Sequence, residues 1–162
     1  MKPEFNYTRH NIVINGLEVK YWDVGQGQPI LLLHGIGSSA EYWSWNMPYL
    51  ADKYRLIVID LPGFGQSAVP RDHNLLQRSY AAAFVDQIIS KLGLDMPIIV
   101  GHSLGAVVAL QYVLSFPERY RGLVLLASPG FGRHIDIITR LLSVPVLGTV
   151  LFQPSGLLSD SY

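Results

Sequence analysis

The sequence predicts an α/β fold, in which an N-terminal antiparallel hairpin precedes a mostly parallel sheet flanked by helices in three α/β/α layers. Asn15-Gly16 lies between two alternating apolar segments, and a two-residue hairpin turn favours this dipeptide because both central residues need positive φ. Short apolar runs without alternation follow, which is typical of parallel strands buried on both faces. The runs are 30–33, 56–59, 98–100 and 123–127.

Helical patterns separate these runs. Ser38 and Glu41 match a capping box and predict the start of a helix. A second helix is predicted from apolar side chains four residues apart, which would form one buried stripe. They are Tyr80, Phe84, Ile88 and Leu92. A third helix is expected to begin near Leu104 and to end before Pro117, because proline cannot continue a helix.

Composition restricts the function classes. The chain has 162 residues, no cysteine, equal numbers of acidic and basic residues, and 49% hydrophobic residues. The balanced charge gives no reason to expect nucleic acid or an anionic membrane as partner, so we predict a small-molecule substrate. The lack of cysteine excludes disulfides, zinc-thiolate sites and a cysteine nucleophile. The sequence predicts no cofactor and no metal.

Two segments bear on location. Residues 1–10 are polar and show no secretory signal. The longest apolar stretch, 141–152, is interrupted by Pro145 and Gly148 and is shorter than the about 20 residues that span a bilayer. We therefore expect a cytoplasmic protein without a membrane span.

The exit of the third run carries the most specific motif. In such a sheet, functional residues gather after the carboxyl ends of the strands. Gly101-His102-Ser103-Leu104-Gly105 is a G-x-S-x-G sequence between a predicted strand and a predicted helix. Its glycines permit a turn so tight that the Ser103 hydroxyl projects above the sheet. The sequence thus predicts Ser103 as a catalytic nucleophile.

The exit of the first run predicts the matching oxyanion donors. Acyl transfer needs two backbone N–H groups on the developing oxyanion, here those of Ile36 and Leu104. We interpret His34 and Gly35 as support for this loop, since a histidine there more often orders a loop than transfers protons. His102 is expected to pack or to line the pocket, because a side chain in a tight turn does not readily reach its neighbour's hydroxyl.

The exit of the second run is interpreted as structural. Residues 60–67 read Asp-Leu-Pro-Gly-Phe-Gly-Gln-Ser, and the proline and glycines shape a loop. Asp60 is expected to tie this loop by accepting hydrogen bonds from backbone N–H groups.

The segments 34–37, 60–67 and 101–105, in this order and spacing, strongly resemble the α/β-hydrolase superfamily, and within it the cap-bearing esterases and carbon–carbon bond hydrolases. The resemblance implies Ser103 as nucleophile and Ile36 and Leu104 as oxyanion donors. It also implies a triad acid and a histidine later in the chain, in the order Ser, Asp/Glu, His. The predicted enzyme is a serine hydrolase that cleaves an ester or similar acyl or carbonyl bond of a small, partly apolar substrate.

The acid and the histidine have no clear counterpart in this sequence. We expect residues 1–132 to form the N-terminal part of the hydrolase core and 133–162 the truncated start of a helical cap. His134 and Asp136 are two residues apart on a predicted helix, so they would point in different directions. The chain alone is therefore expected to be nearly inactive. Run 123–127 is expected to be an exposed edge strand through which the chain self-associates.

Two rival interpretations stay open. Residues 35–40 match a dinucleotide-binding fingerprint, with Asp60 as its acid, although a dinucleotide fold leaves the hairpin and the turn at Ser103 unexplained. A non-catalytic protein could also keep the scaffold and bind a small ligand. Trp43, Trp45 and Phe64 suggest an apolar acyl or ring moiety in the substrate, but the sequence does not choose between ester, thioester, amide and carbon–carbon cleavage.

Overall fold

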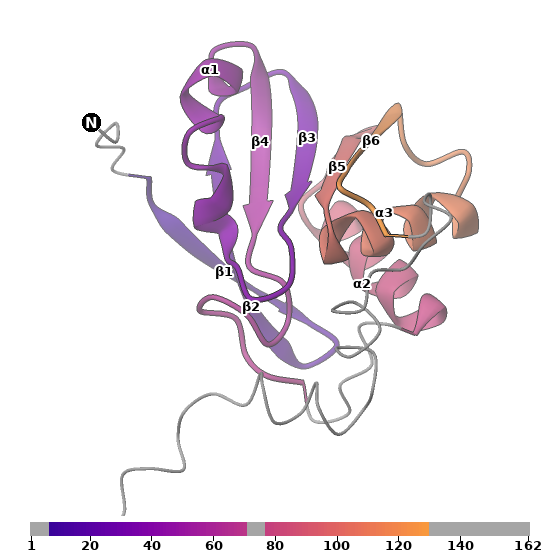
Figure 1. The fold of residues 1–162 in the computed structure, drawn as a ribbon. Helices are drawn as coiled ribbons and strands as arrows, with labels where there is room; N and C mark the ends of the chain where they lie inside the picture. Colours follow the sequence, from indigo (N-terminus) through magenta and orange to yellow (C-terminus); the bar gives the residue numbers. More distant parts are fainter. Residues whose placement is uncertain (1–6, 71–76, 130–162) are drawn as a thin grey trace, which may run out of the picture. The chain divides into compact units, whose positions relative to one another are not determined.

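The fold of residues 7–70 and 77–129 is described by a computed structural model (Figure 1). Along the chain the elements are β1 (Arg9–Ile14), β2 (Leu17–Val24), β3 (Gln28–Leu33), the 3-10 helix η1 (Ala40–Trp43), α1 (Met47–Ala51), β4 (Tyr54–Ile59), α2 (Arg78–Lys91), β5 (Ile98–His102), α3 (Leu104–Ser115) and β6 (Gly122–Leu126). The predicted cap segment 133–162, with His134 and Asp136, lies outside the described residues, and the boundary at residue 132 stays a prediction.

The strands form one six-stranded sheet in the order β1-β2-β4-β3-β5-β6. β1 pairs antiparallel with β2, and β2 pairs antiparallel with β4. The pairs β3–β4, β3–β5 and β5–β6 are parallel. The predicted α/β class, with an antiparallel hairpin before parallel strands, is confirmed.

The turn between β1 and β2 has the predicted chemistry. Asn15 has φ 51° and Gly16 has φ 78°, so both central residues adopt the positive φ that this turn requires. Ile14 and Leu17 face each other across its base. The hairpin register therefore follows from a local dipeptide.

The two central strands are buried on both faces, and their alternating side chains feed two hydrophobic clusters. Leu31, Leu33, Ile57 and Ile59 pack with residues of α2 and α3 on one face. Ile30, Leu32, Leu56 and Val58 pack with Ala40, Trp43 and Met47 of η1 and α1 on the other. The strand exits that carry the predicted site are thus anchored from both sides.

Three local predictions need correction. The helix predicted from Ser38 is a single 3-10 turn whose N-cap is Ser39, and the Ser39 hydroxyl accepts a hydrogen bond from the Glu41 N–H at 3.3 Å. The last predicted strand ends at Leu126, because Ala127 has φ 47°, which no strand residue adopts. Leu92 is the C-cap of α2 and not part of the helix.

Candidate active site

Ser103 lies between β5 and α3 in a strained backbone conformation. Its φ of 51° and ψ of −111° are rare for any residue with a side chain, and such geometry costs about 1–3 kcal/mol. The neighbouring structure holds it in place, since the Ser103 N–H donates to the Leu126 carbonyl at 2.9 Å. Its own carbonyl accepts from the N–H groups of Ala106 and Val107 at 3.0 and 3.2 Å. The sheet and the first turn of α3 together impose the turn that the motif predicts.

Gly101 and Gly105 allow the turn because backbone atoms occupy the space of a side chain. A Cβ atom on Gly101 would lie 2.6 Å from the Cα atom of Ala106, and one on Gly105 would lie 2.7 Å from the carbonyl oxygen of His34. Distances this short do not occur between real atoms of these types. The two glycines thus let α3 pack directly against the exits of β3 and β5.

Residues 34–39, which we call the β3 exit loop, approach Ser103 through Gly35. A Cβ atom on Gly35 would lie 2.8 Å from His102 Nδ1 and 3.2 Å from Ser103 Cβ. Ile36 follows directly, and its side chain is 42% exposed. Within the described residues no carbonyl accepts the N–H of Ile36 or that of Leu104. Both N–H groups thus lack a backbone acceptor within the described part of the chain.

His34 is fully buried, and both of its ring nitrogens are engaged. Nδ1 lies 2.7 Å from the Gly35 carbonyl oxygen, and Nε2 accepts from the Leu61 N–H at 2.9 Å. These contacts require a neutral ring that carries its proton on Nδ1. Burial lowers the pKa of His34, more than its hydrogen bond to Gly35 raises it. The ring holds the loop and has no free nitrogen with which to take a proton from Ser103.

His102 stacks on Tyr42. The ring centroids are 4.5 Å apart with an angle of 19° between the planes, and Tyr42 is 43% exposed. The Nδ1 atom of His102 is buried and has no hydrogen-bond partner among the described residues. Nothing in the sequence pattern signals the position of Tyr42, because it depends on how η1 packs over the end of β5.

Asp60 is fully buried at the end of β4 and connects four segments. Oδ1 accepts from the Ala40 N–H at 2.6 Å, and Oδ2 accepts from the Gln66 N–H at 2.9 Å and from Arg9 Nη1 at 3.0 Å. The Arg9 guanidinium also lies 4.7 Å from the centre of the Trp22 ring. The predicted tie to the 60–67 loop is present. The carboxylate is fully buried and already accepts from three donors, so it does not reach the surface where the ribose of a dinucleotide would bind, which argues against that rival interpretation.

The aromatic residues that the sequence suggested for the pocket have different roles. Trp43 belongs to the core cluster under η1, and Phe64 packs edge-on against the His34 ring with centroids 5.8 Å apart. Of the three, only Trp45 has an exposed side chain. Three exposed apolar residues instead belong to segments that contact the Ser103 turn. They are Ile36, which follows Gly35, Tyr42, which stacks on His102, and Leu126, whose carbonyl accepts from the Ser103 N–H.

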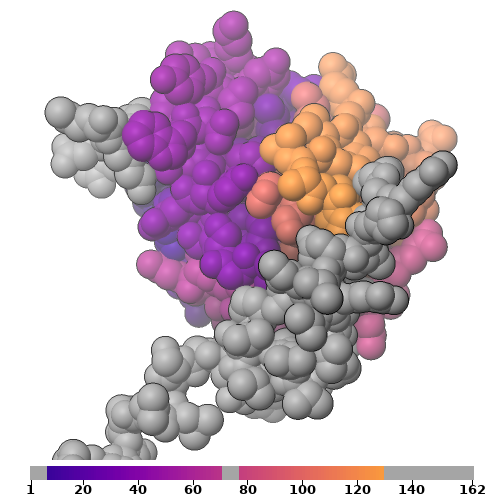
Figure 2. All heavy atoms as spheres, in the orientation of Figure 1, coloured from indigo at the N-terminus to yellow at the C-terminus, as the bar shows by residue number. Residues whose placement is uncertain are grey.

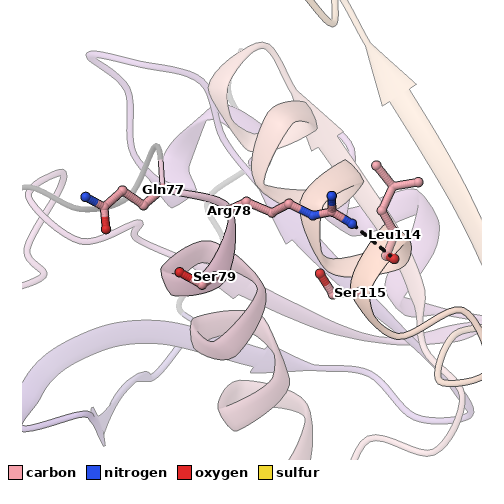
Figure 3. Close-up of a pocket in the computed structure, with 5 residues that line it drawn as sticks. All are labelled: Gln77, Arg78, Ser79, Leu114 and Ser115. Atoms are coloured by element: carbon pink, nitrogen blue, oxygen red, sulfur yellow. Dashed lines mark hydrogen bonds between the residues drawn. The ribbon is translucent and has the colours of Figure 1, made fainter.

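A surface hollow opens elsewhere, between the start of α2 and the end of α3 (Figure 3). Arg78 crosses it and donates to the Leu114 carbonyl at 3.4 Å. Because Ser103 precedes the first residue of α3 and Leu114 is near its last, roughly 15 Å of helix separates the hollow from Ser103. It is not part of the candidate active site.

The described part of the chain offers neither a metal centre nor a membrane helix. Among residues 7–70 and 77–129, no three His, Asp or Glu side chains lie together as metal ligands would. No helix in those ranges is long and apolar enough to cross a bilayer.

Comparison with known proteins identifies the family of this chain. The family described as alpha/beta hydrolase fold matches residues 28–145, which is more than half of the chain. The chain belongs to the α/β-hydrolase fold family. The matched range includes the β3 exit loop, Asp60 and Ser103.

Individual members of the α/β-hydrolase family are similar over most of this chain. An uncharacterised protein of Mycobacterium tuberculosis is 36% identical over 134 residues, which are 82% of this chain and 38% of that protein. The 2-hydroxy-6-oxo-6-phenylhexa-2,4-dienoate hydrolase of Burkholderia cepacia is 34% identical over 139 residues, 82% of this chain and 48% of that enzyme. The epoxide hydrolase CorEH superposes with a TM-score of 0.76 and 29% identity, over 90% of this chain and 55% of that one. The chain spans less than half the length of these curated relatives.

Proposed function

We propose that this chain carries the nucleophile and the oxyanion donors of a serine hydrolase that cleaves an acyl or carbonyl bond of a small, partly apolar substrate. The observation that carries the proposal is the strained turn at Ser103, directly before the Leu104 N–H, for which no described residue supplies a backbone acceptor. Strain of this kind persists where surrounding structure imposes it and is concentrated at active sites. The name of the Burkholderia cepacia relative, a hydrolase of a substrate with a ketone, supports this reaction class. The epoxide hydrolase supports hydrolysis in general.

In the proposed reaction, Ser103 Oγ attacks the carbonyl carbon of the substrate, and the carbonyl oxygen becomes an oxyanion. The N–H groups of Ile36 and Leu104 donate to that oxygen, which is the step where preorganised donors contribute most to rate. Collapse of the tetrahedral intermediate breaks the bond to the leaving group, which departs with the proton taken from Ser103, and gives an acyl ester on Ser103. Attack by water on this ester then releases the acid and restores the hydroxyl.

The proton of Ser103 must pass to a base outside the described residues. His34 has no free nitrogen, and His102 precedes Ser103 in the turn with its ring stacked on Tyr42. A positioned base contributes about 10²–10⁴ in rate, and oxyanion donors alone retain part of the catalysis. In the family the acid and the histidine follow the nucleophile in sequence. We therefore propose that the described core positions Ser103 without activating it.

The substrate is proposed to be partly apolar, because Ile36 and Tyr42 present exposed apolar surface beside the strand exits. The Burkholderia cepacia relative is named for a substrate with a phenyl ring and a ketone, which adds carbon–carbon cleavage next to a carbonyl to ester cleavage as a candidate reaction. Both reactions need the same nucleophile and the same donors.

The test is phosphonylation by a fluorophosphonate probe with and without added imidazole, which can act as an external base. The P–Oγ bond forms, the P–F bond breaks, and the proton passes to imidazole or solvent. We expect slow labelling at Ser103, read by mass spectrometry, and acceleration by imidazole that Ser103→Ala abolishes. Labelling that Ser103→Ala leaves unchanged would contradict the proposal. Fast labelling without imidazole would place a base within this chain, with His134 as the first residue to replace.

A further inference from the structure

The β3 exit loop is held at both ends by Asp60 and Leu61, two consecutive residues that follow β4. At its start, His34 Nε2 accepts from the Leu61 N–H at 2.9 Å, and just past its end the Ala40 N–H donates to Asp60 Oδ1 at 2.6 Å. Within the loop, the Ser38 N–H donates to the Gly35 carbonyl at 3.3 Å and closes a turn around Ile36. The position of the Ile36 N–H thus depends on contacts to the end of β4.

The Asp60 carboxylate is itself fixed from several directions. The Arg9 guanidinium and the Gln66 N–H hold Oδ2, and the Asp60 N–H donates to the Lys20 carbonyl at 2.9 Å. The Ser67 hydroxyl donates to the Asp60 carbonyl at 2.7 Å. The side chain is only 1% exposed, so water does not compete for these contacts. Charge-assisted hydrogen bonds in such surroundings are strong and directional.

We propose that Asp60 is a positioning residue, which fixes the Ile36 N–H relative to Ser103 Oγ through the Ala40 N–H. The proposal rests on the proposed function, because it assigns the Ile36 N–H to the oxyanion. A donor acts on the oxyanion only within a narrow distance range, and loss of one donor lowers rates by about 10²–10³. Displacement of the loop, with Leu104 intact, is expected to cost about tenfold or more in the phosphonylation rate constant at saturating probe.

Asp60→Asn is the sharpest variant. When the carbonyl oxygen of the asparagine takes the place of Oδ2, it keeps the hydrogen bonds from Arg9 and from the Gln66 N–H. Its NH₂ group then takes the place of Oδ1 and faces the Ala40 N–H. Two donors then face each other, and the end of the loop is released. Ser67→Ala is the matched control, because it removes the hydrogen bond to the Asp60 carbonyl, and the one that Ser67 Oγ accepts from the Lys20 N–H, without touching the loop.

Two spectra test the proposal. In the unlabelled protein, the Ile36 amide resonance is expected to move in Asp60→Asn and to stay in Ser67→Ala. In the phosphonylated protein, the ³¹P resonance reports hydrogen bonds to the P=O oxygen, and Asp60→Asn is expected to shift it toward the value of the denatured adduct. Folded Asp60→Asn protein with both wild-type resonances would overturn the proposal.

Two further outcomes remain decisive. If Asp60→Asn does not fold, amide hydrogen exchange in the wild-type protein replaces the measurement on the variant. An Ala40 amide that exchanges as fast as one in an unstructured peptide would overturn the proposed role of its hydrogen bond to Asp60. If Ser103 is not labelled at all, the proposed function fails, whereas the Ile36 amide resonance still decides whether Asp60 positions the loop.

Discussion

The His34 imidazole accepts a hydrogen bond from the Leu61 backbone N–H at 2.9 Å, 27 residues away along the chain. The acceptor is Nε2, so this contact exists only while the ring is neutral. A protonated ring would turn an N–H against the N–H of Leu61 inside the core. The link between the exits of β3 and β4 is therefore sensitive to pH.

We predict that acid weakens the fold through His34. Burial lowers its pKa below the ordinary 6.5, so the unfolded chain binds a proton that the folded chain excludes. This contribution is complete above about pH 6.5 and is lost as the pH falls toward the lowered folded-state pKa. Urea unfolding at about pH 7.5 and about pH 5 measures it.

Two variants separate His34 from the other titrating groups. His34→Gln is expected to be less stable at neutral pH and to lose part of the pH dependence. His10→Gln, at an exposed position on β1, is expected to keep the wild-type slope. An equal slope in all three proteins would contradict the assignment to His34.

Gly105→Ala is expected to lower the free energy of unfolding by about 1–3 kcal/mol or more, because the new Cβ meets backbone atoms that cannot rotate away. Gly122→Ala is the control. Its Cβ would lie 3.9 Å from the nearest atoms, both in the Ile98 side chain, so the expected change is within about 0.5 kcal/mol. Equal losses in the two variants would show that crowding at the turn is not the cause.

Removing the side chain of Ser103 is expected to stabilise the fold. Ser103→Gly and Ser103→Ala both lack the hydroxyl, but only glycine adopts φ 51° and ψ −111° without strain. Glycine loses more chain entropy on folding, which offsets about 0.4–1 kcal/mol of the relieved strain. We therefore expect the free energy of unfolding of Ser103→Gly to exceed that of Ser103→Ala by about 1 kcal/mol. Thermal and urea unfolding would measure the difference. A less stable glycine variant would argue against strain at this residue.

Self-association through β6 is expected. No strand among the described residues pairs with its outer edge, and Val124 and Leu126 are 43% and 40% exposed. The segment around β6, orange in Figure 2, lies at the surface in that view. Val124→Lys should shift sedimentation toward monomer, because charges on an edge strand oppose pairing. Val69→Lys, which changes an exposed valine in a loop, should leave the sedimentation unchanged. An equal effect of Val124→Lys and Val69→Lys would show that general hydrophobic attraction, and not pairing of β6, causes the association.

Local chemistry explains what the sequence predicted well. The turn at Asn15 and the turn at Ser103 depend on residues adjacent in the chain, and both lie where expected. Ser39 replaces Ser38 as a cap because two neighbouring serines offer the same hydroxyl, and only packing of η1 on the sheet chooses between them. Boundaries shift where the local alternatives are nearly equal in energy.

Contacts between residues far apart in the chain could not be predicted from the sequence. β4 lies between β2 and β3, and this order brings Asp60 to Arg9, 51 residues away. An aspartate that ties its own loop is predictable from the adjacent glycines, but its bond to the Ala40 N–H is not. The stack of Tyr42 on His102 likewise depends on two segments 60 residues apart that meet only in the folded sheet.

The hydrogen bond from the Ser103 N–H to the Leu126 carbonyl has a consequence for how the chain folds. The hairpin can close early, because its contacts are local and loop closure over a few residues is fast. The turn at Ser103 gains this support only after β6 has docked beside β5, across the whole of α3. Mutations at Ser103 should therefore change the unfolding rate and leave the folding rate almost unaltered, with φ-values near zero. The proposed nucleophile would then be among the last residues to reach its native conformation.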